Sequence, residues 1–157
     1  MSVAFRRESD DEHMEPKFEL PIPPGPNWVT ARGLALTQDR VAALEAADLS
    51  GLDEEAVKKH RRELRYWRTR LATAQVQPMP QGEEVAFGSR VTFSLNGKER
   101  RIDIVGDDEA DPHEGRIAFS APLARAIMGA WPDENMDFAG KAGAITVLAV
   151  EAIPQGE

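Results

Sequence analysis

The first apolar repeat along the chain has the period of a helix. Beginning at Thr30, the apolar residues Leu34, Val41 and Leu44 recur at spacings of seven and three residues, with polar residues between them. Residues at these spacings fall on one face of an α-helix. The pattern therefore predicts a helix that begins near Thr30 and ends before the acidic stretch 47–56.

A second and stronger helical repeat follows this stretch. Val57, Leu64 and Leu71 are seven residues apart, and a second set interleaves with the same spacing: His60, Trp67 and Ala74. Two interleaved heptad positions are typical of a coiled-coil seam. We expect an antiparallel helical hairpin with a tight turn near Gly51. Its second helix should have about 20 residues and a length of roughly 30 Å.

Beyond residue 84 the apolar residues alternate with polar ones, which is the pattern of half-buried β-strands. A first strand leads to Leu95, Asn96-Gly97 is a strong hairpin-turn signal, and Ile102 and Ile104 alternate on the returning strand. We expect further strands around Ile117, at 136–139 and at 144–153. The second half of the chain thus predicts an antiparallel sheet.

The stretch SAPLARAIMG, residues 120–129, predicts one short helix in this half. Ser120 can cap it, Pro122 is tolerated in its first turn, and Gly129 can end it. Leu123 and Ile127 are four residues apart, so they share a helix face and should pack on the sheet. The expected fold class is α+β: an N-terminal antiparallel helical hairpin, forming a short coiled coil, followed by an antiparallel β domain with one short helix.

These patterns divide the chain into four parts. We expect an extended, flexible arm over 1–29, the helical hairpin over 30–76, a linker over 77–84 and the sheet domain over 85–153. The arm is highly charged and has four prolines in PIPPGPN, which favours an extended path. Trp28 and Val29 can anchor its end on the body of the protein.

Composition narrows the class of protein. Apolar residues make up 41% and charged residues 29% of the 157 residues, which is typical of globular proteins. With no cysteine, the chain has neither a disulfide framework nor a thiolate metal site. No run of 18 apolar residues occurs, and the start of the chain turns acidic before any apolar stretch. We therefore expect a cytoplasmic protein without membrane partners.

The net charge of −8 argues against general affinity for nucleic acid. Positive charge is nevertheless concentrated in one place, because seven of the 19 Lys and Arg residues fall between Lys58 and Arg70. Those outside the apolar seam form what we call the basic stripe: Lys58, Lys59, Arg61, Arg62, Arg65 and Arg68. The stripe is either a solvated helix face or a contact surface for an acidic partner.

Carboxylates cluster near the expected hairpin turn. One explanation of Asp48, Asp53, Glu54 and Glu55 is the acidic start of a helix, and Ser50-x-x-Asp53 has the spacing of a capping box. The alternatives are a functional acidic tip and a metal site. The first explanation accounts for most of the cluster without any ligand.

A second acidic cluster lies in the loop 106–115, with the members Asp107, Asp108, Glu109 and Asp111. It lacks the spacing of a calcium-binding loop and indicates a solvated connection or a partner surface. The three histidines are scattered, and the chain contains no nucleotide-binding or hydrolase fingerprint. We therefore expect no metal site and no cofactor.

The segments IVGDDEAD (104–111) and GRIAFSAPLARAIMG (115–129) resemble the C-terminal domain of the GreA/GreB family of bacterial transcription elongation factors. VTARG (29–33) and LATAQV (71–76) extend the resemblance over residues 28–153. It implies an FKBP-like sheet domain that docks at the rim of the secondary channel of RNA polymerase. The candidates for polymerase contacts are Arg125, Ser120, Pro122, Asp108, Glu109 and Asp111.

In this family the hairpin points down the channel, and acids at its tip help hold a magnesium ion that assists hydrolysis of backtracked RNA. The present chain departs from the cleavage-competent members. Gly51 and Leu52 stand where the family has a glutamate and an asparagine, and the helices are shorter. The short hairpin and Ala121-Pro122, in place of Ser-Pro, are similar to the regulator of nucleoside diphosphate kinase.

That relative binds RNA polymerase without stimulating cleavage. We therefore expect a monomeric, non-enzymatic regulator that binds RNA polymerase and makes no sequence-specific contact with nucleic acid. The alternative is a transcript-cleavage factor whose acidic hairpin tip helps hold magnesium at the polymerase active site.

Overall fold

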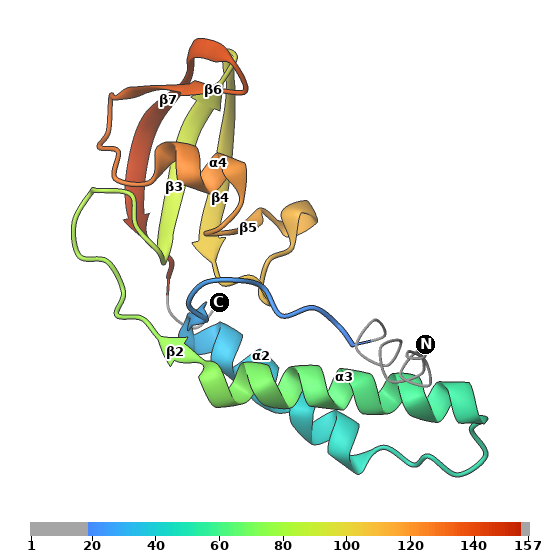
Figure 1. Cartoon of the computed structure of the whole chain (residues 1–157). Coiled ribbons are helices and arrows are strands. Elements are labelled where there is room, and N and C mark those ends of the chain that lie inside the picture. Colours follow the sequence, from blue (N-terminus) through green and yellow to red (C-terminus); the bar gives the residue numbers. More distant parts are fainter. Residues whose placement is uncertain (1–18, 155–157) are drawn as a thin grey trace, which may run out of the picture. The chain divides into compact units, whose positions relative to one another are not determined.

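The computed structural model describes residues 19–154, which belong to two compact units (Figure 1). Of the described residues, the hairpin unit comprises 19–25 and Thr37–Thr73, and the sheet unit comprises Pro26–Leu36 and 74–154. Residues 1–18 of the expected arm lie outside the described part. Within that part, no helix has the length and apolar character needed to cross a membrane.

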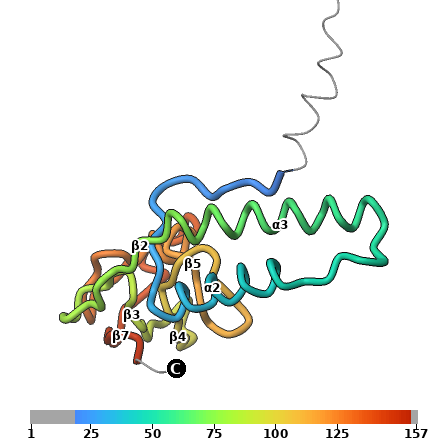
Figure 2. The backbone as a smooth tube through the Cα atoms, turned by 90° about the horizontal axis from the view of Figure 1, so that it is seen from below, coloured from blue at the N-terminus to red at the C-terminus, as the bar shows by residue number. Residues whose placement is uncertain are grey.

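Two antiparallel helices, α2 (Ala31–Ala46) and α3 (Glu54–Thr73), form the expected hairpin (Figure 2). Thr30 begins α2, because its hydroxyl accepts a 3.0 Å hydrogen bond from the Gly33 N–H and its carbonyl accepts one from the Leu34 N–H. In the connection, the Leu52 N–H donates to the Leu49 carbonyl, and Gly51 has a φ of 83°. The predicted turn and the 20-residue second helix are thus confirmed.

The helices of the hairpin unit meet through a half-buried seam and several polar contacts. Val41 is buried, while Val57, Leu64 and Leu71 remain half-buried. His60 Nε2 lies 2.8 Å from the Leu44 carbonyl oxygen. The guanidinium of Arg40 lies over the Trp67 ring, and Arg68 pairs with Glu45 at 2.9 Å. The predicted seam exists, but its apolar residues on α3 are only half-buried.

The sheet unit contains five strands in the order β5-β4-β3-β7-β6. Their bounds are β3 Ser89–Leu95, β4 Lys98–Val105, β5 Arg116–Ala118, β6 Asn135–Phe138 and β7 Lys141–Ala152. Asn96 and Gly97 have φ values of 52° and 87°, so the predicted hairpin turn between β3 and β4 is confirmed.

One edge of this sheet differs from the expected antiparallel pattern. The short strand β5 pairs with β4 in parallel, with Asp103 opposite Arg116 and Val105 opposite Ala118. The loop 106–115 makes this possible because it carries the chain back past the strand that it has just left. It contains a 3-10 turn, Pro112–Glu114, and closes at Gly115 in the left-handed conformation.

A second, two-stranded parallel sheet fixes the segment before α2. Its strands are β1 (Trp28–Val29) and β2 (Gln75–Val76). The Trp28 ring stacks on Phe119 at 4.9 Å between centroids and meets Phe87 edge-on. Val29 is buried. The expectation that Trp28 and Val29 anchor the arm is therefore confirmed.

The short helix α4 (Pro122–Ile127) packs on one face of the sheet (Figure 1). Ile127 is fully buried in the same core as Phe93, Ile104 and Ile145, and Leu123 is partly buried against it. Gly129 follows the helix with a φ of 84°, as expected for its end.

The prediction that Ser120 caps α4 is wrong. The N-cap residue is Ala121, which has no capping side chain. The Ser120 hydroxyl is not available, because it donates a 2.5 Å hydrogen bond to Asp107 Oδ1. Pro122 occupies the first helical position, where its missing N–H costs no helical hydrogen bond.

Candidate functional site

The tip of the hairpin is the connection between α2 and α3, and two of its four carboxylates are held by local hydrogen bonds. Asp53 is the N-cap of α3, since its Oδ1 accepts a 2.8 Å bond from the Ala56 N–H. Ser50 is therefore not the cap that the capping-box spacing suggested. Its N–H and hydroxyl both donate to Asp48 Oδ1, at 2.9 and 2.7 Å.

All four carboxylates of the tip are exposed: Asp48, Asp53, Glu54 and Glu55. The two hydrogen bonds from Ser50 lower the pKa of Asp48 below its usual range. This carboxylate is therefore a restrained anion at neutral pH. Glu54 and Glu55 occupy the first turn of α3, where the helix dipole favours negative charge.

The tip does not form a metal site by itself. Over the described residues 19–154, no group of three or more His, Asp or Glu side chains is placed to hold a metal ion. Exposed carboxylates can still complete the coordination of a magnesium ion that a partner holds, because such ions retain exchangeable oxygen ligands. The tip can thus supply one or two carboxylate ligands to a magnesium ion that a partner protein holds.

The basic stripe lies on α3, and three of its members pair with carboxylates of the same unit. Lys58 lies 4.0 Å from Glu54, Arg65 pairs with Glu19, and Arg68 pairs with Glu45. Lys59 and Arg61 are exposed. The stripe is therefore a largely exposed row of positive charges on α3. Glu19, Glu45 and Glu54 of the same unit partly balance it.

The loop 106–115 separates the second acidic cluster into buried and exposed members. Asp107 accepts the hydrogen bond from Ser120, Asp108 is half-buried and Asp111 is exposed. Glu109, a candidate for a polymerase contact, is buried within the sheet unit. The structure thus brings Asp107 and Ser120 together and turns Glu109 inward.

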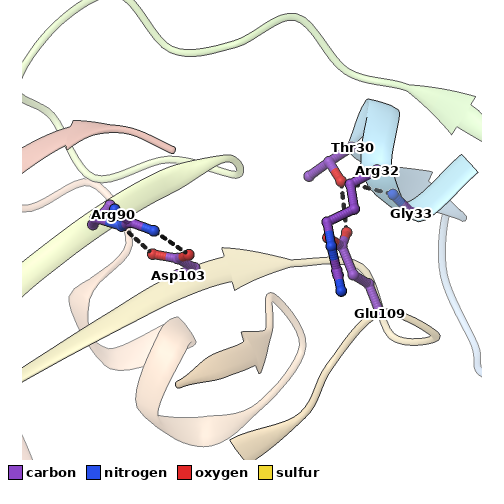
Figure 3. A network of polar contacts seen from close by, with 6 residues as sticks. All are labelled: Thr30, Arg32, Gly33, Arg90, Asp103 and Glu109. Atoms are coloured by element: carbon purple, nitrogen blue, oxygen red, sulfur yellow. Dashed lines mark hydrogen bonds and ion pairs between the residues drawn. The ribbon is translucent and has the colours of Figure 1, made fainter. Parts of the chain in front are cut away.

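The carboxylate of Glu109 ties the loop to the start of α2 (Figure 3). Its Oε1 accepts a 2.6 Å hydrogen bond from the Thr30 hydroxyl, and its Oε2 lies 3.1 Å from Arg32 Nη1. Gly33 gives this carboxylate room, because a Cβ at this position would lie 2.8 Å from Glu109 Oε1. A side chain there would therefore require the Glu109 carboxylate to shift.

This network borders a polar cleft of about 560 Å³ in the sheet unit. Its lining includes a second ion pair, in which Arg90 Nε and Asp103 Oδ1 are 2.8 Å apart (Figure 3). Arg116 and Glu114 also line it. The cleft therefore carries three cationic and three anionic side chains, and four of these six form ion pairs with one another.

The surface at the end of α4 includes residues that sequence reasoning missed. Arg125 is exposed, as predicted, and Pro122 is exposed at the start of the helix. Met128 and Trp131 follow with 36% and 50% of their surface exposed. Tryptophan, methionine and arginine are enriched in protein interfaces. The position of Trp131 in the turn-rich stretch GAWPDE was the available signal that it lies outside the core.

Comparisons with known proteins agree with this architecture. Residues 79–153 match the family described as "Transcription elongation factor, GreA/GreB, C-term". Transcription elongation factor GreA from Vibrio cholerae is 31% identical over 140 residues, which cover 73% of this chain and 89% of that protein. GreA from Thioalkalivibrio sulfidiphilus is 45% identical over 65 residues, but this match spans only 41% of that protein.

A crystal structure of GreA factor homolog 1 from Thermus thermophilus is a distant match. It is 18% identical, covers 82% of this chain and 100% of that chain, and has a TM-score of 0.38. Similarity at this level supports no conclusion about arrangement or activity.

The relatives correct one expectation from the sequence. Departures at the hairpin tip suggested a protein that is not an enzyme, yet the matched relatives are named as GreA itself, and the Vibrio cholerae match extends beyond the C-terminal domain. The expectation that the protein is not an enzyme, which was based on those departures, is therefore wrong. The match of residues 79–153 to the family's C-terminal domain, together with relatives that are 31% identical over most of their length, shows that the chain belongs to the GreA/GreB family of transcription elongation factors.

Proposed function

We propose that this protein is a transcription elongation factor that binds RNA polymerase at the rim of its secondary channel. The sheet unit is the docking part, and the hairpin enters the channel. Family membership supports this proposal, as does the match of residues 79–153 to the C-terminal domain of the family. A protein that binds RNA polymerase in this way would act in the cytoplasm.

The second part of the proposal is that the hairpin tip assists hydrolysis of backtracked RNA. The observation that carries it is the exposed, restrained acidic tip, which lacks a metal site of its own. Asp48 is the leading candidate for the carboxylate that helps hold a magnesium ion at the polymerase active site. Asp48 would supply one oxygen ligand to such an ion, and the chemistry that the ion would supply when bound is activation of the attacking water.

The decisive experiment measures RNA cleavage in stalled elongation complexes to which the purified protein is added. The test variant is Asp48→Asn combined with Asp53→Asn. Asparagine preserves the N-cap of α3 while removing the charge, so the hairpin stays folded. The matched control is Glu83→Gln combined with Glu84→Gln, which removes two exposed carboxylates from the linker.

We expect the wild-type protein and the linker variant to stimulate cleavage and the tip variant to lose most of this stimulation. All three should bind RNA polymerase with similar affinity. Full cleavage with the tip variant would contradict the role of these carboxylates. Cleavage by none of the proteins, with binding intact, would remove the second part of the proposal and leave the first.

The docking surface is tested separately on α4. Arg125→Ala should weaken polymerase binding without changing the melting temperature, because the side chain is exposed and its removal opens no cavity. Arg100→Ala, at an exposed position of β4, is the matched control. Equal affinity of both variants would place the docking surface away from Arg125.

A further inference from the structure

The polar cleft of the sheet unit contains charged side chains that have no role in the proposed function. Every residue that lines the cleft belongs to this unit, so the cleft is formed within one compact body. Its volume of about 560 Å³ falls within the range of about 300–1,000 Å³ that is usual for small-molecule sites. The cleft is therefore large enough to hold a small organic molecule.

Three neighbouring strands contribute a row of charged side chains to the cleft. Arg90 on β3 lies opposite Asp103 on β4, and Asp103 lies opposite Arg116 on β5. Residues that lie opposite one another on neighbouring strands have their side chains on the same face of the sheet. Arg90 Nε donates to Asp103 Oδ1 at 2.8 Å, and Arg90 Nη2 donates to Oδ2 at 3.1 Å (Figure 3). Both oxygens of Asp103 are therefore occupied by one of its two arginine neighbours.

Arg116 is the arginine of this row that no carboxylate neutralises. Within the part of the chain that the structure describes, its side chain forms no ion pair and no hydrogen bond. It is half-buried, so its charge is less screened by water than that of an exposed arginine. Arg32 also lines the cleft, and it uses one guanidinium nitrogen for Glu109, at 3.1 Å. Since a guanidinium has five N–H donors, both arginines can bind an anion.

The carboxylates of the cleft determine which anion fits. Asp103 and Glu109 already accept hydrogen bonds at both of their oxygens, and Glu114 is exposed. The three carboxylates repel a dianion more strongly than a monoanion, and a phosphate group carries a charge of about −1.5 to −2 at neutral pH. The planar fork of a guanidinium matches a carboxylate in a bidentate contact. A single carboxylate therefore suits the cleft better than a phosphate group.

The cleft also has an apolar lining. Val105 is buried, and Met79 and Ile153 are half-buried. Covering apolar surface of a ligand with such side chains favours binding. This lining suits the hydrocarbon body of a ligand whose carboxylate contacts an arginine.

We propose that the cleft binds a small organic acid that has one carboxylate and an aliphatic body. The carboxylate lies against Arg116 and Arg32, and the body packs on the apolar lining. The site goes beyond the proposed function and does not depend on it, because its test uses this protein alone.

The test is an NMR titration of the isotope-labelled, full-length protein with three probes: isocaproate, the neutral amide of isocaproate, and inorganic phosphate. We expect isocaproate to shift the backbone amide resonances of Val105, Arg116 and Ile153 in a saturable way. The neutral amide lacks the charge and phosphate lacks the apolar body, so each should bind about tenfold more weakly or worse.

The test variant is Arg116→Gln, which removes the unneutralised guanidinium without breaking an ion pair. The matched control is Arg100→Gln, at an exposed position of β4 outside the cleft. We expect Arg116→Gln to weaken the binding of isocaproate about tenfold and the control to leave it unchanged. Arg116→Lys keeps the charge but not the planar fork, so its affinity should lie between those of the wild type and Arg116→Gln.

Equal affinities of the wild type and Arg116→Gln would overturn the proposal. Two results on the wild type alone would overturn it as well: equal binding of isocaproate and its amide, or tighter binding of phosphate than of isocaproate. Shifts that are spread over the basic residues of α3, without saturation in the cleft, would show non-specific attraction of anions and would also overturn it.

Discussion

The two units of this protein are built on different physical principles. The sheet unit has a dry core in which Phe93, Ile104, Ile127 and Ile145 have no exposed surface. In the described part of the hairpin unit, Val41 is the one buried apolar side chain, and the seam of α3 is half-buried. The hairpin instead relies on a helix cap, a ring contact and a charged pair between its helices.

The difference indicates that the sheet unit is the more stable part and the hairpin unit the more adaptable part. Burial of apolar surface contributes about 25 cal/mol per Å², so the sheet core can support a folded unit. Helices with few buried contacts depend on local interactions such as caps and side-chain pairs, and their local unfolding requires little free energy. A stable sheet is suited to anchoring, and a polar hairpin is suited to an aqueous, charged environment. This division agrees with the roles proposed for the two units.

The largest effect should come from the sheet core. Ile127→Ala leaves a cavity beneath α4 and should lower the free energy of unfolding by about 2–5 kcal/mol. Leu123→Ala, on the same helix but only partly buried, is the control and should cost less. Urea denaturation followed by circular dichroism measures both. Similar losses for the two variants would show that α4, rather than the core beneath it, sets the stability.

A smaller effect is expected from the network around Glu109. Glu109→Ala leaves Arg32 without this carboxylate and removes the acceptor of the Thr30 hydroxyl, at an expected cost of about 1–3 kcal/mol. Asp111→Asn, in the same loop but exposed, should change the free energy of unfolding little. A neutral result for Glu109→Ala would mean that the loop can repack around the vacant site.

The features that could be predicted from the sequence are those with local causes. The period of the apolar residues located both helices of the hairpin and most strands, and Asn96-Gly97 located the turn between β3 and β4. The end of α4 at Gly129 also follows from a local rule, because glycine adopts the left-handed conformation there without strain.

The features that could not be predicted depend on contacts between distant parts of the chain. Glu109 was assigned to a surface cluster because its neighbours are acidic, yet it bonds to Thr30, 79 residues earlier. Ser120 has the chemistry of a cap, but Asp107 accepts its hydrogen bond. The parallel pairing of β5 likewise depends on the path of a loop, which apolar alternation does not encode.

Substitution of the N-cap residue of α3 tests how far the hairpin depends on local hydrogen bonds. Asp53→Ala removes the acceptor of the Ala56 N–H and should lower stability by about 1 kcal/mol. Asp53→Asn keeps an acceptor at this position and is the matched control. Helical ellipticity during thermal unfolding measures both. Equal melting of the alanine and asparagine variants would show that the connection, rather than the cap, fixes the start of α3.

The smallest effect should be the coupling between Arg68 and Glu45 in the hairpin. Their side chains are 56% and 48% exposed, whereas Arg90 and Asp103, the comparable pair in the sheet unit, are 12% and 18% exposed. Double-mutant cycles with Gln and Asn replacements isolate each pairwise energy. Water and salt screen the exposed pair, so its coupling should be about 0.2–1 kcal/mol and should fall further at high salt. The shielded pair should show the larger coupling and the weaker dependence on salt. The reverse order would mean that the hairpin is held by its charges more firmly than its exposure implies, and the contrast between a rigid anchor and an adaptable hairpin would not hold.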